Sequence, residues 1–310
     1  MRLHGLDALR IYAALCVIYI HAMKDAVPFI LHGDYAVTLF FVLSGFLLSY
    51  RLMEERAATG RIDISVFYRK RARRILPIYF LVLLVSLPFG LSSQAAWLTL
   101  ALSPHLANAL AFPLGAIAHF WSLGVEIWFY ALLPQLAARF SWERVGIGLV
   151  VVFGLAHELA RLSGYANGGL FFGMMRLECM GVGVLFAWSL HQRKQWLKWG
   201  YHAIAVVSAL GLLFAITLAP MAFMFRDLVI SVAFGVVIIN AGRFPKLDAK
   251  WVRHLGTLTY GIYAWHYILL YVAEYVMSGL PLLVFTTIFS IAMAQITYTL
   301  IEKPIMQRRG

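Results

Sequence analysis

The sequence predicts an all-α polytopic membrane protein with about ten transmembrane helices and both termini in the cytoplasm. Hydrophobic residues make up 62% of the 310 residues, the mean hydropathy is +0.80, and only 13% of the residues are charged. Soluble domains are close to half apolar and about one quarter charged, so this composition excludes an ordinary soluble protein. We expect residues 1–310 to form a single membrane-embedded domain in contact with a lipid bilayer.

Apolar runs predict the individual helices. A helix needs about 20 mainly apolar residues to cross the hydrocarbon core of a bilayer. The first run follows a basic N-terminal stretch, but no small-residue cleavage site precedes the second run, so we interpret it as a retained helix rather than a signal peptide. The expected spans cover roughly 8–28, 35–53, 75–91, 119–138, 145–162, 169–190, 200–219, 222–241, 255–278 and 281–302.

The long connection between the third and fourth spans has a different composition from the others. Residues 92–118 contain no Lys or Arg and include Pro104, Asn108 and Pro113. Prolines interrupt regular helices, and irregular backbone at membrane depth must be shielded from lipid. We therefore expect an extracytoplasmic loop with short interfacial or re-entrant pieces.

The distribution of basic residues predicts the orientation in the membrane. About 21 of the 26 Lys and Arg residues fall in the termini and in alternate loops, which is typical of cytoplasmic segments. This places both termini in the cytoplasm, in agreement with an even number of spans. The net charge of +12 then follows from topology, and we expect no nucleic-acid partner.

The cysteines give no indication of a disulfide framework or a metal site. Cys16 and Cys179 both fall in apolar segments, and neither belongs to a cluster with metal-ligand spacing. We expect no bound metal.

Arg10 and His21 in the first span are the strongest candidates for a functional site. They are eleven residues apart, which is three helical turns plus about 20°, so their side chains share one face at a separation of roughly 16 Å. Ionisable groups inside a bilayer are costly and commonly functional. Arg10 could instead pair with Asp7 at the interface, and His21 could be a hydrogen-bonded core residue.

Arginines concentrate just before the third span. Arg71, Arg73 and Arg74 belong to the run YRKRARRILPIY. Guanidinium groups bind phosphate through two parallel hydrogen bonds, so a cluster at the mouth of a helical bundle suits phosphate recognition. The alternative is an anchor for lipid headgroups that fixes the topology.

Polar residues also recur inside later spans. His119, Ser122 and Glu126 follow one another at i, i+3 and i+7, so they lie on one face of the span 119–138 in either a structural or a substrate-binding role. His266 lies near the middle of the span 255–278. Arg176 and Glu178 are two residues apart and cannot face each other on a helix, so each requires a partner on another helix.

Taken together, these strings resemble the acyltransferase-3 family of integral-membrane O-acyltransferases. They occur in the family's order and span nearly the entire chain, with a small departure at Ala36-Val37, where the family often has Gly-Val. The matching strings are LDALR followed by His21, FFVLSGFLLS at 40–49, RARRILPIY at 71–79, WSLGVEIWFY at 121–130, RLECMGVGVLF at 176–186, YGIYAWH at 260–266 and EKP at 302–304.

The resemblance implies an enzyme that transfers an acyl group, commonly acetyl, from cytoplasmic acyl-CoA. The acceptor would be a hydroxyl on a sugar of a surface or secreted glycan or of a glycosylated small molecule, and the location a bacterial cytoplasmic (inner) membrane. Acyl-CoA is then a substrate, and no cofactor is bound. By position, the resemblance marks Arg10 and His21 as the functional pair, the arginines at 71–74 as donor-side residues, and Ser122 and Glu126 as a family motif.

These expectations combine into a mechanistic hypothesis. A thioester is already activated, so the reaction needs a base for the attacking hydroxyl and stabilisation of an oxyanion. His21 is the candidate base, because imidazole titrates in a suitable range. Arg10, Arg71, Arg73 and Arg74 would bind the CoA phosphates.

The remaining polar residues have supporting roles in this hypothesis. Glu126 would orient His21 or bind acceptor hydroxyls, and Ser122 would donate a hydrogen bond. Direct transfer is preferred, and an acyl-enzyme on His21, Ser44 or Ser122 stays open. Further supporting candidates are His119, His266, Arg176 and Glu178.

Two other functions could use the same residues. A transporter or flippase for a polar or anionic solute also needs Arg, His and Glu inside the membrane, although residues 1–155 and 156–310 show no obvious repeat of the kind common in transporters. The other interpretation is a structural partner of a glycan-assembly complex, but the joint presence of Arg10, His21 and Glu126 disfavours it.

Overall fold

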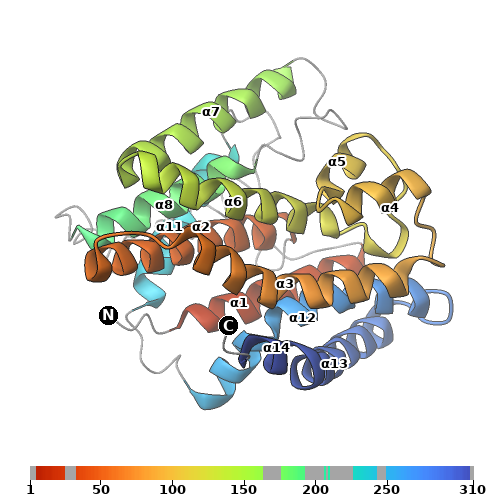
Figure 1. The fold of residues 1–310 in the computed structure, drawn as a ribbon. Coiled ribbons are helices and arrows are strands. Elements are labelled where there is room, and N and C mark those ends of the chain that lie inside the picture. Colours follow the sequence, from red (N-terminus) through yellow and green to blue (C-terminus); the bar gives the residue numbers. More distant parts are fainter. Residues whose placement is uncertain are drawn as a thin grey trace.

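The computed structural model describes residues 5–24, 33–162, 176–192, 226–242 and 249–307, together with Val206 and Ala209. This part of the chain is almost entirely helical and contains no β-strand; a single isolated bridge pairs Leu91 with Leu114. The all-α fold class is therefore confirmed for the described residues (Figure 1).

Several of the described helices run side by side in one bundle (Figure 1). In chain order they are α1 (Leu6–Met23), α2 (Gly33–Thr59), α3 (Ile64–Ser86), α4 (Ser93–Leu100), α5 (Pro104–Ala109), the 3₁₀ turn η2 (Gly115–Ile117), α6 (Phe120–Arg139), α7 (Trp142–Leu162), α8 (Leu177–His191), α11 (Arg226–Ala241), α12 (Lys250–Ala273), α13 (Gly279–Thr297), the π-helical segment η5 (Tyr298–Glu302) and α14 (Lys303–Gln307).

The described helices agree with most of the expected spans. Three continuous helical stretches, Leu6–Met23, Tyr35–Thr59 and Gly279–Gln307, are long and apolar enough to cross a bilayer. The expected span 200–219 lies outside the described residues except for Val206 and Ala209, as do the first residues of the spans expected at 169–190 and 222–241. The number of ten spans and the side of the termini therefore stay predictions.

The third helix begins eleven residues earlier than the apolar run suggested. Asp63 caps the N-terminus of α3, since its carboxylate accepts a hydrogen bond from the backbone N–H of Val66 at 2.9 Å. Lys, Arg and Ala are good helix formers, so the basic run continues the helix although it is not apolar. Arg71 and Arg74, three residues apart, consequently lie on the same face of α3.

The segment 92–118 contains short helices, as expected. Ser92 caps α4 by accepting a hydrogen bond from the N–H of Ala95, and α5 and η2 follow. Ala116 and Ile117 of η2 are fully buried. In Figure 1, α4 and α5 lie together beside the first turns of α6, where they cover one end of the bundle.

Helices α1 and α12 run in the same direction along their length. Near their N-terminal ends, Gly256 of α12 packs directly against the side chain of Asp7 in the first turn of α1. At their last turns, Lys24 forms an ion pair with Glu274 at 2.7 Å. We use "basic end" for the end of the bundle where α1, α3 and α12 begin and α2 ends, and "opposite end" for the other.

Glycines bring α2 and α8 into backbone contact. A Cβ atom at Gly45 would overlap the Met180 carbonyl, and a Cβ atom at Gly183 would overlap the Val42 carbonyl. Small residues at helix interfaces allow this close approach and are common in membrane helices. The contact fixes α2, whose side chains form one wall of the cavity described below.

We predict that Gly45→Ala destabilises the protein. The added methyl group must push α2 and α8 apart, and overpacking of this kind costs about 1–3 kcal/mol. Gly148→Ala is the matched control, because no atom lies within 4 Å of a Cβ at that position of α7. Thermal unfolding of the detergent-solubilised protein should show a lower midpoint for Gly45→Ala only. Equal midpoints for both variants would contradict the packing argument.

Candidate active site

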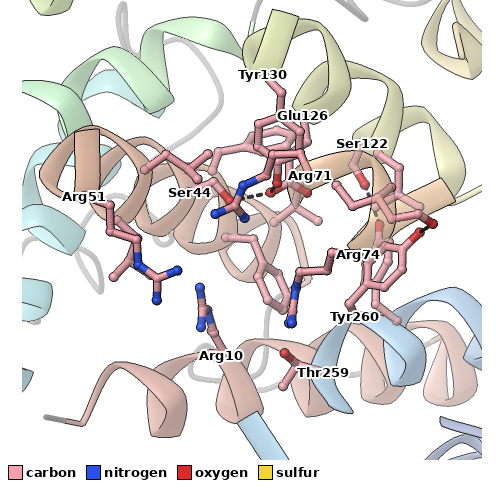
Figure 2. A pocket seen from close by; sticks show the side chains of 18 residues that line it. Arg10, Ser44, Arg51, Arg71, Arg74, Ser122, Glu126, Tyr130, Thr259 and Tyr260 are labelled. Atoms are coloured by element: carbon pink, nitrogen blue, oxygen red, sulfur yellow. Dashed lines mark hydrogen bonds between the residues drawn. The ribbon is translucent and has the colours of Figure 1, made fainter. Parts of the chain in front are cut away.

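A cavity of about 110 Å³ lies between α1, α2, α3, α6 and α12, and we call it the arginine cavity. One part of its lining is apolar and includes Val37, Phe40 and Leu48. The polar part is shown in Figure 2. The polar lining residues are Arg10, Ser44, Arg51, Arg71, Arg74, Ser122, Glu126, Tyr130, Thr259, Tyr260 and Tyr263.

Four guanidinium groups dominate the charge of this cavity. They come from three helices, and Figure 2 shows those of Arg10, Arg51 and Arg74 pointing into the same space. Arg10 also contacts the carboxylate of Asp7 at 3.2 Å. Glu126 is the one acidic side chain among the described residues that line the cavity. Several like charges in an apolar surrounding create a strong positive potential, so the cavity favours an anionic ligand.

Arg71 is partly buried between two aromatic side chains. Its guanidinium group lies over the rings of Phe67 and Tyr130, 5.8 Å from each centroid. Its Nε atom is buried and has no hydrogen-bond partner among the described residues. A buried donor without a partner is costly, which indicates that a ligand oxygen can complete this site.

Glu126 is held by two hydroxyl groups. Ser44 of α2 donates a hydrogen bond to Oε1 at 2.5 Å, and Tyr130, one turn later on α6, donates to the same oxygen. The bond from Ser44 connects α2 to α6, and the bond from Tyr130 within α6 helps to fix the carboxylate beside Arg71 (Figure 2).

Three histidines gather toward the opposite end of the bundle, and we call them the histidine cluster. They are His21 of α1, His119 at the start of α6 and His266 of α12. The ring centroids of His21 and His266 are 5.3 Å apart, and those of His119 and His266 are 4.6 Å apart. None of the three is among the described residues that line the arginine cavity.

The hydrogen bonds of this cluster assign the tautomers. Nδ1 of His266 faces the Tyr263 carbonyl at 2.6 Å, so Nδ1 carries the proton and Nε2 is an acceptor. Nδ1 of His21 faces the Val17 carbonyl at 2.8 Å and Nε2 of His266 at 3.3 Å, so it too carries a proton. The lone pair of a neutral His21 ring is then on Nε2.

Ser122 and Tyr263 lie at the boundary between the cavity and the histidine cluster. Both line the cavity, and their hydroxyl oxygens are 2.6 Å apart. The Tyr263 hydroxyl also donates to the His119 carbonyl at 3.1 Å. The two groups of functional candidates are therefore neighbours that share this boundary.

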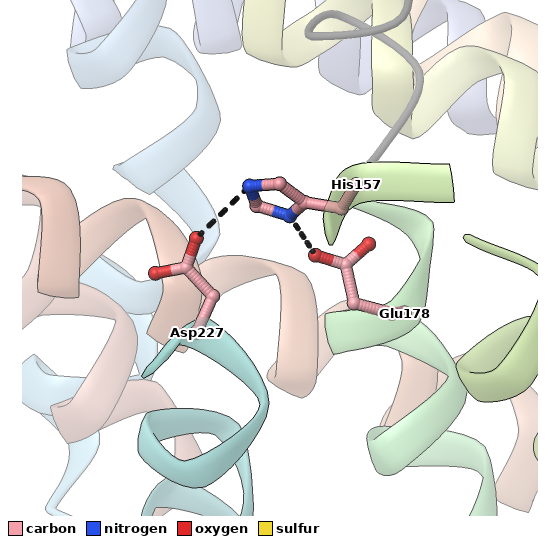
Figure 3. Close-up of side chains that lie close together, drawn as sticks. All are labelled: His157, Glu178 and Asp227. Carbon is pink, nitrogen blue, oxygen red and sulfur yellow. Dashed lines mark hydrogen bonds and ion pairs between the residues drawn. The ribbon is translucent and has the colours of Figure 1, made fainter. Parts of the chain in front are cut away.

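Arg176 and Glu178 belong to a separate polar cluster at the opposite end, formed with Thr38, His157 and Asp227. Figure 3 shows His157, Glu178 and Asp227 of this cluster. Arg176 donates to the Thr38 hydroxyl at 3.0 Å and lies 3.4 Å from Asp227. Glu178 contacts Nδ1 of His157 at 3.1 Å. The expectation that each finds a partner on another element is thus confirmed.

A metal ion is conceivable only at this second cluster among the residues that the structure describes. His157, Glu178 and Asp227 offer ligand atoms that lie within 4.8 Å of one another. However, the two ring nitrogens of His157 face different carboxylates, and one imidazole cannot present both nitrogens to one ion. Arg176 adds a further positive charge beside Asp227. The geometry therefore favours an ion-pair network that connects α7, α8 and α11.

The structure brings most of the predicted site residues together. Arg10, Ser44, Arg71, Arg74, Ser122 and Glu126 line one cavity, and His21, His119 and His266 form one cluster. Arg73 is not among the described lining residues, although its neighbour Arg74 is.

Sequence reasoning missed several cavity residues. Arg51 follows Ser44 by seven residues, and Tyr130 follows Glu126 by four, so helical spacing would have placed both on the same faces. Tyr263 precedes His266 by three residues, which is the same signal.

The sequence matches the family model described as "Acyltransferase domain" over residues 3–300. It is 26% identical to the O-acetyltransferase OatA of Staphylococcus aureus, with the same values for strains NCTC 8325, COL and MRSA252, and the alignment covers 99% of this chain. The alignment covers 57% of those proteins, so the chain spans a little more than half the length of these relatives. No solved structure matches the chain.

We predict that Glu178→Ala lowers stability without changing ligand affinity in the arginine cavity. Removing a carboxylate that is 1% exposed takes away the nearest acidic partner of His157, and breaking a buried ion pair costs about 3–5 kcal/mol. Glu143→Ala, at an exposed position near the start of α7, is the control. The thermal unfolding midpoint and the affinity for CoA, the ligand expected from the sequence, would be measured for each variant. Loss of CoA binding at an unchanged unfolding midpoint would refute the separation of the arginine cavity from the cluster around Glu178.

Proposed function

This chain belongs to the acyltransferase-3 family of integral-membrane O-acyltransferases, and from this premise we propose that it uses acyl-CoA as donor. The acyl group is acetyl, in line with the O-acetyltransferase names of the relatives. The acceptor is a sugar hydroxyl. The sugar belongs to a surface or secreted glycan or to a glycosylated small molecule.

The arginine cavity is the observation that carries this proposal. CoA bears several phosphate groups, and guanidinium is the side chain best suited to bind phosphate with two parallel hydrogen bonds. Four arginines face a single carboxylate in the described lining, and Nε of Arg71 has no hydrogen-bond partner there. The adjoining apolar wall, with Phe40 and Leu48, suits the less polar pantetheine arm.

The positive-inside rule supports a cytoplasmic position of the basic end. In that orientation the chain is a multi-pass protein of a bacterial cytoplasmic (inner) membrane with both termini in the cytoplasm. The donor then enters the arginine cavity from the cytoplasm, where acyl-CoA is found. The acceptor reaches the histidine cluster from the opposite end.

His21 acts as the general base in this proposal. Its Nε2 takes the proton from the acceptor hydroxyl while the hydroxyl oxygen attacks the thioester carbonyl carbon. The new C–O bond forms, the C–S bond breaks, and the proton passes to the sulfur of the departing CoA. His266 keeps the proton of His21 on Nδ1, and Glu126 balances charge in the donor cavity rather than touching His21. An acylated enzyme trapped after mixing with donor alone would overturn this direct transfer.

A transporter or flippase for an anionic solute is the second candidate, because an arginine-lined cavity would also bind such a solute. The names of the relatives favour acyl transfer. Release of free CoA by the purified protein from acetyl-CoA distinguishes the two, since a transporter leaves the thioester intact.

We predict that His21→Ala abolishes acyl transfer while the protein still folds in membranes. The loss of a general base typically lowers the rate by about 10²–10⁴-fold. His254→Ala serves as the control, because this exposed histidine contacts Gln295 away from the cluster. The measurement is CoA release from acetyl-CoA in membrane vesicles. Activity of His21→Ala close to that of the unmodified protein would refute the base assignment.

We predict that Arg71→Ala and Arg10→Ala weaken donor binding. A hydrogen bond to a charged group contributes about 1.5–3 kcal/mol, so the dissociation constant for CoA should rise about ten-fold or more in each variant. Arg69→Ala is the control, because Arg69 lies on the same helix but is exposed. Binding of CoA to the solubilised protein would be measured by calorimetry. Equal affinities of the Arg69 and Arg71 variants would argue against the arginine cavity as the donor site.

A further inference from the structure

The donor cavity and the histidine cluster meet at the side chain of Tyr263. The cavity is lined by Tyr263 and Ser122, and the rings of His119 and His266 contact the Tyr263 ring at centroid separations of 5.1 and 5.4 Å. His266 in turn contacts His21. Under the proposed function, the CoA phosphates bind the arginines near the basic end. The acyl group is the opposite end of the donor, so it must pass Tyr263 to come within reach of His21.

Tyr263 is fixed in place from several sides. Its hydroxyl oxygen lies 2.6 Å from that of Ser122 and 3.1 Å from the His119 carbonyl. Its own carbonyl accepts the hydrogen bond from His266. Its ring packs edge-on against Phe40 and His119, with centroid separations of 6.0 and 5.1 Å. A buried ring with this many contacts does not move aside readily for a larger ligand.

We propose that Tyr263, held by its hydrogen bond to Ser122, determines which acyl groups the enzyme transfers by narrowing the passage from the arginine cavity to His21. This inference rests on the proposed function. A short acyl group fits beside the ring, whereas a longer chain meets it. One methylene group in a tight apolar site changes specificity by about 10–200-fold, so a single ring can select among acyl lengths.

Tyr260 offers a matched control on the same helix. It is also a tyrosine that lines the arginine cavity, one turn closer to the start of α12. Its hydroxyl donates to the Ile75 carbonyl on α3 at 2.8 Å, so it faces a different neighbour. Replacing Tyr260 removes the same atoms from the cavity without opening the boundary with the histidines.

The test compares acetyl-, propionyl- and butyryl-CoA as donors in inverted membrane vesicles from the native cells, which retain the acceptor. CoA release gives kcat/KM for each donor. We expect the ratio of butyryl to acetyl values to rise about ten-fold or more in Tyr263→Ala, the lower limit for one methylene group. In Tyr260→Ala both values should change in proportion and the ratio should stay within about two-fold.

Two milder variants keep the ring and test the role of the hydrogen bond. Tyr263→Phe and Ser122→Ala each remove one partner of the same hydrogen bond but leave the aromatic ring in place. Each should therefore raise the ratio of the butyryl-CoA to the acetyl-CoA kcat/KM by less than Tyr263→Ala does. The double variant should resemble the single ones, because residues in direct contact show non-additive effects. Fluorescence size-exclusion profiles establish that each variant is folded.

The outcomes separate this inference from the proposed function. If the wild-type protein releases no CoA from any donor, the proposed function fails. If it turns over acetyl-CoA but the ratio is unchanged in all Tyr263 and Ser122 variants, or rises equally in Tyr260→Ala, Tyr263 is not the specificity-determining residue and the proposed function stands.

Discussion

A charge inside an apolar helix bundle must meet an opposite charge, a hydrogen-bonding group or a ligand, and this constraint organises the molecule. At the opposite end, Arg176 and His157 lie beside the two carboxylates of Glu178 and Asp227, so that positive and negative groups face one another. In the arginine cavity the charges do not balance, because four guanidinium groups face a single carboxylate, that of Glu126, in the described lining. The difference between the two clusters distinguishes a structural network from a binding site.

The sequence predicted those properties that depend on composition and helical spacing. Apolar runs located α6 and α7 closely, and the common face of Ser122 and Glu126 was confirmed, since both line the cavity. The start of α3 was missed, because Asp63 and the basic run after it form a helix without being apolar. Hydropathy reports what is buried in lipid, and a helix can extend well beyond that part.

Contacts between helices distant in sequence could not be read from one chain. The separation of Arg10 from His21 into two neighbouring groups depends on where α6 and α12 place Ser122 and Tyr263. Likewise, the pairing of Glu178 with His157 requires α7 and α8 to be adjacent. Helical periodicity predicts which residues share a face of one helix, but the residue opposite that face is decided by tertiary packing.

The backbone contact between α2 and α8 at Gly45 and Gly183 also limits how the enzyme can be redesigned. Ser44 and Arg51 lie on a helix that has no room to shift, so the wall they form cannot be remodelled by neighbouring substitutions. Helix α12 supplies the facing wall with tyrosine side chains, which can be exchanged individually. Engineering toward new donors should therefore vary the tyrosine side chains of α12 and leave the glycine contact between α2 and α8 intact.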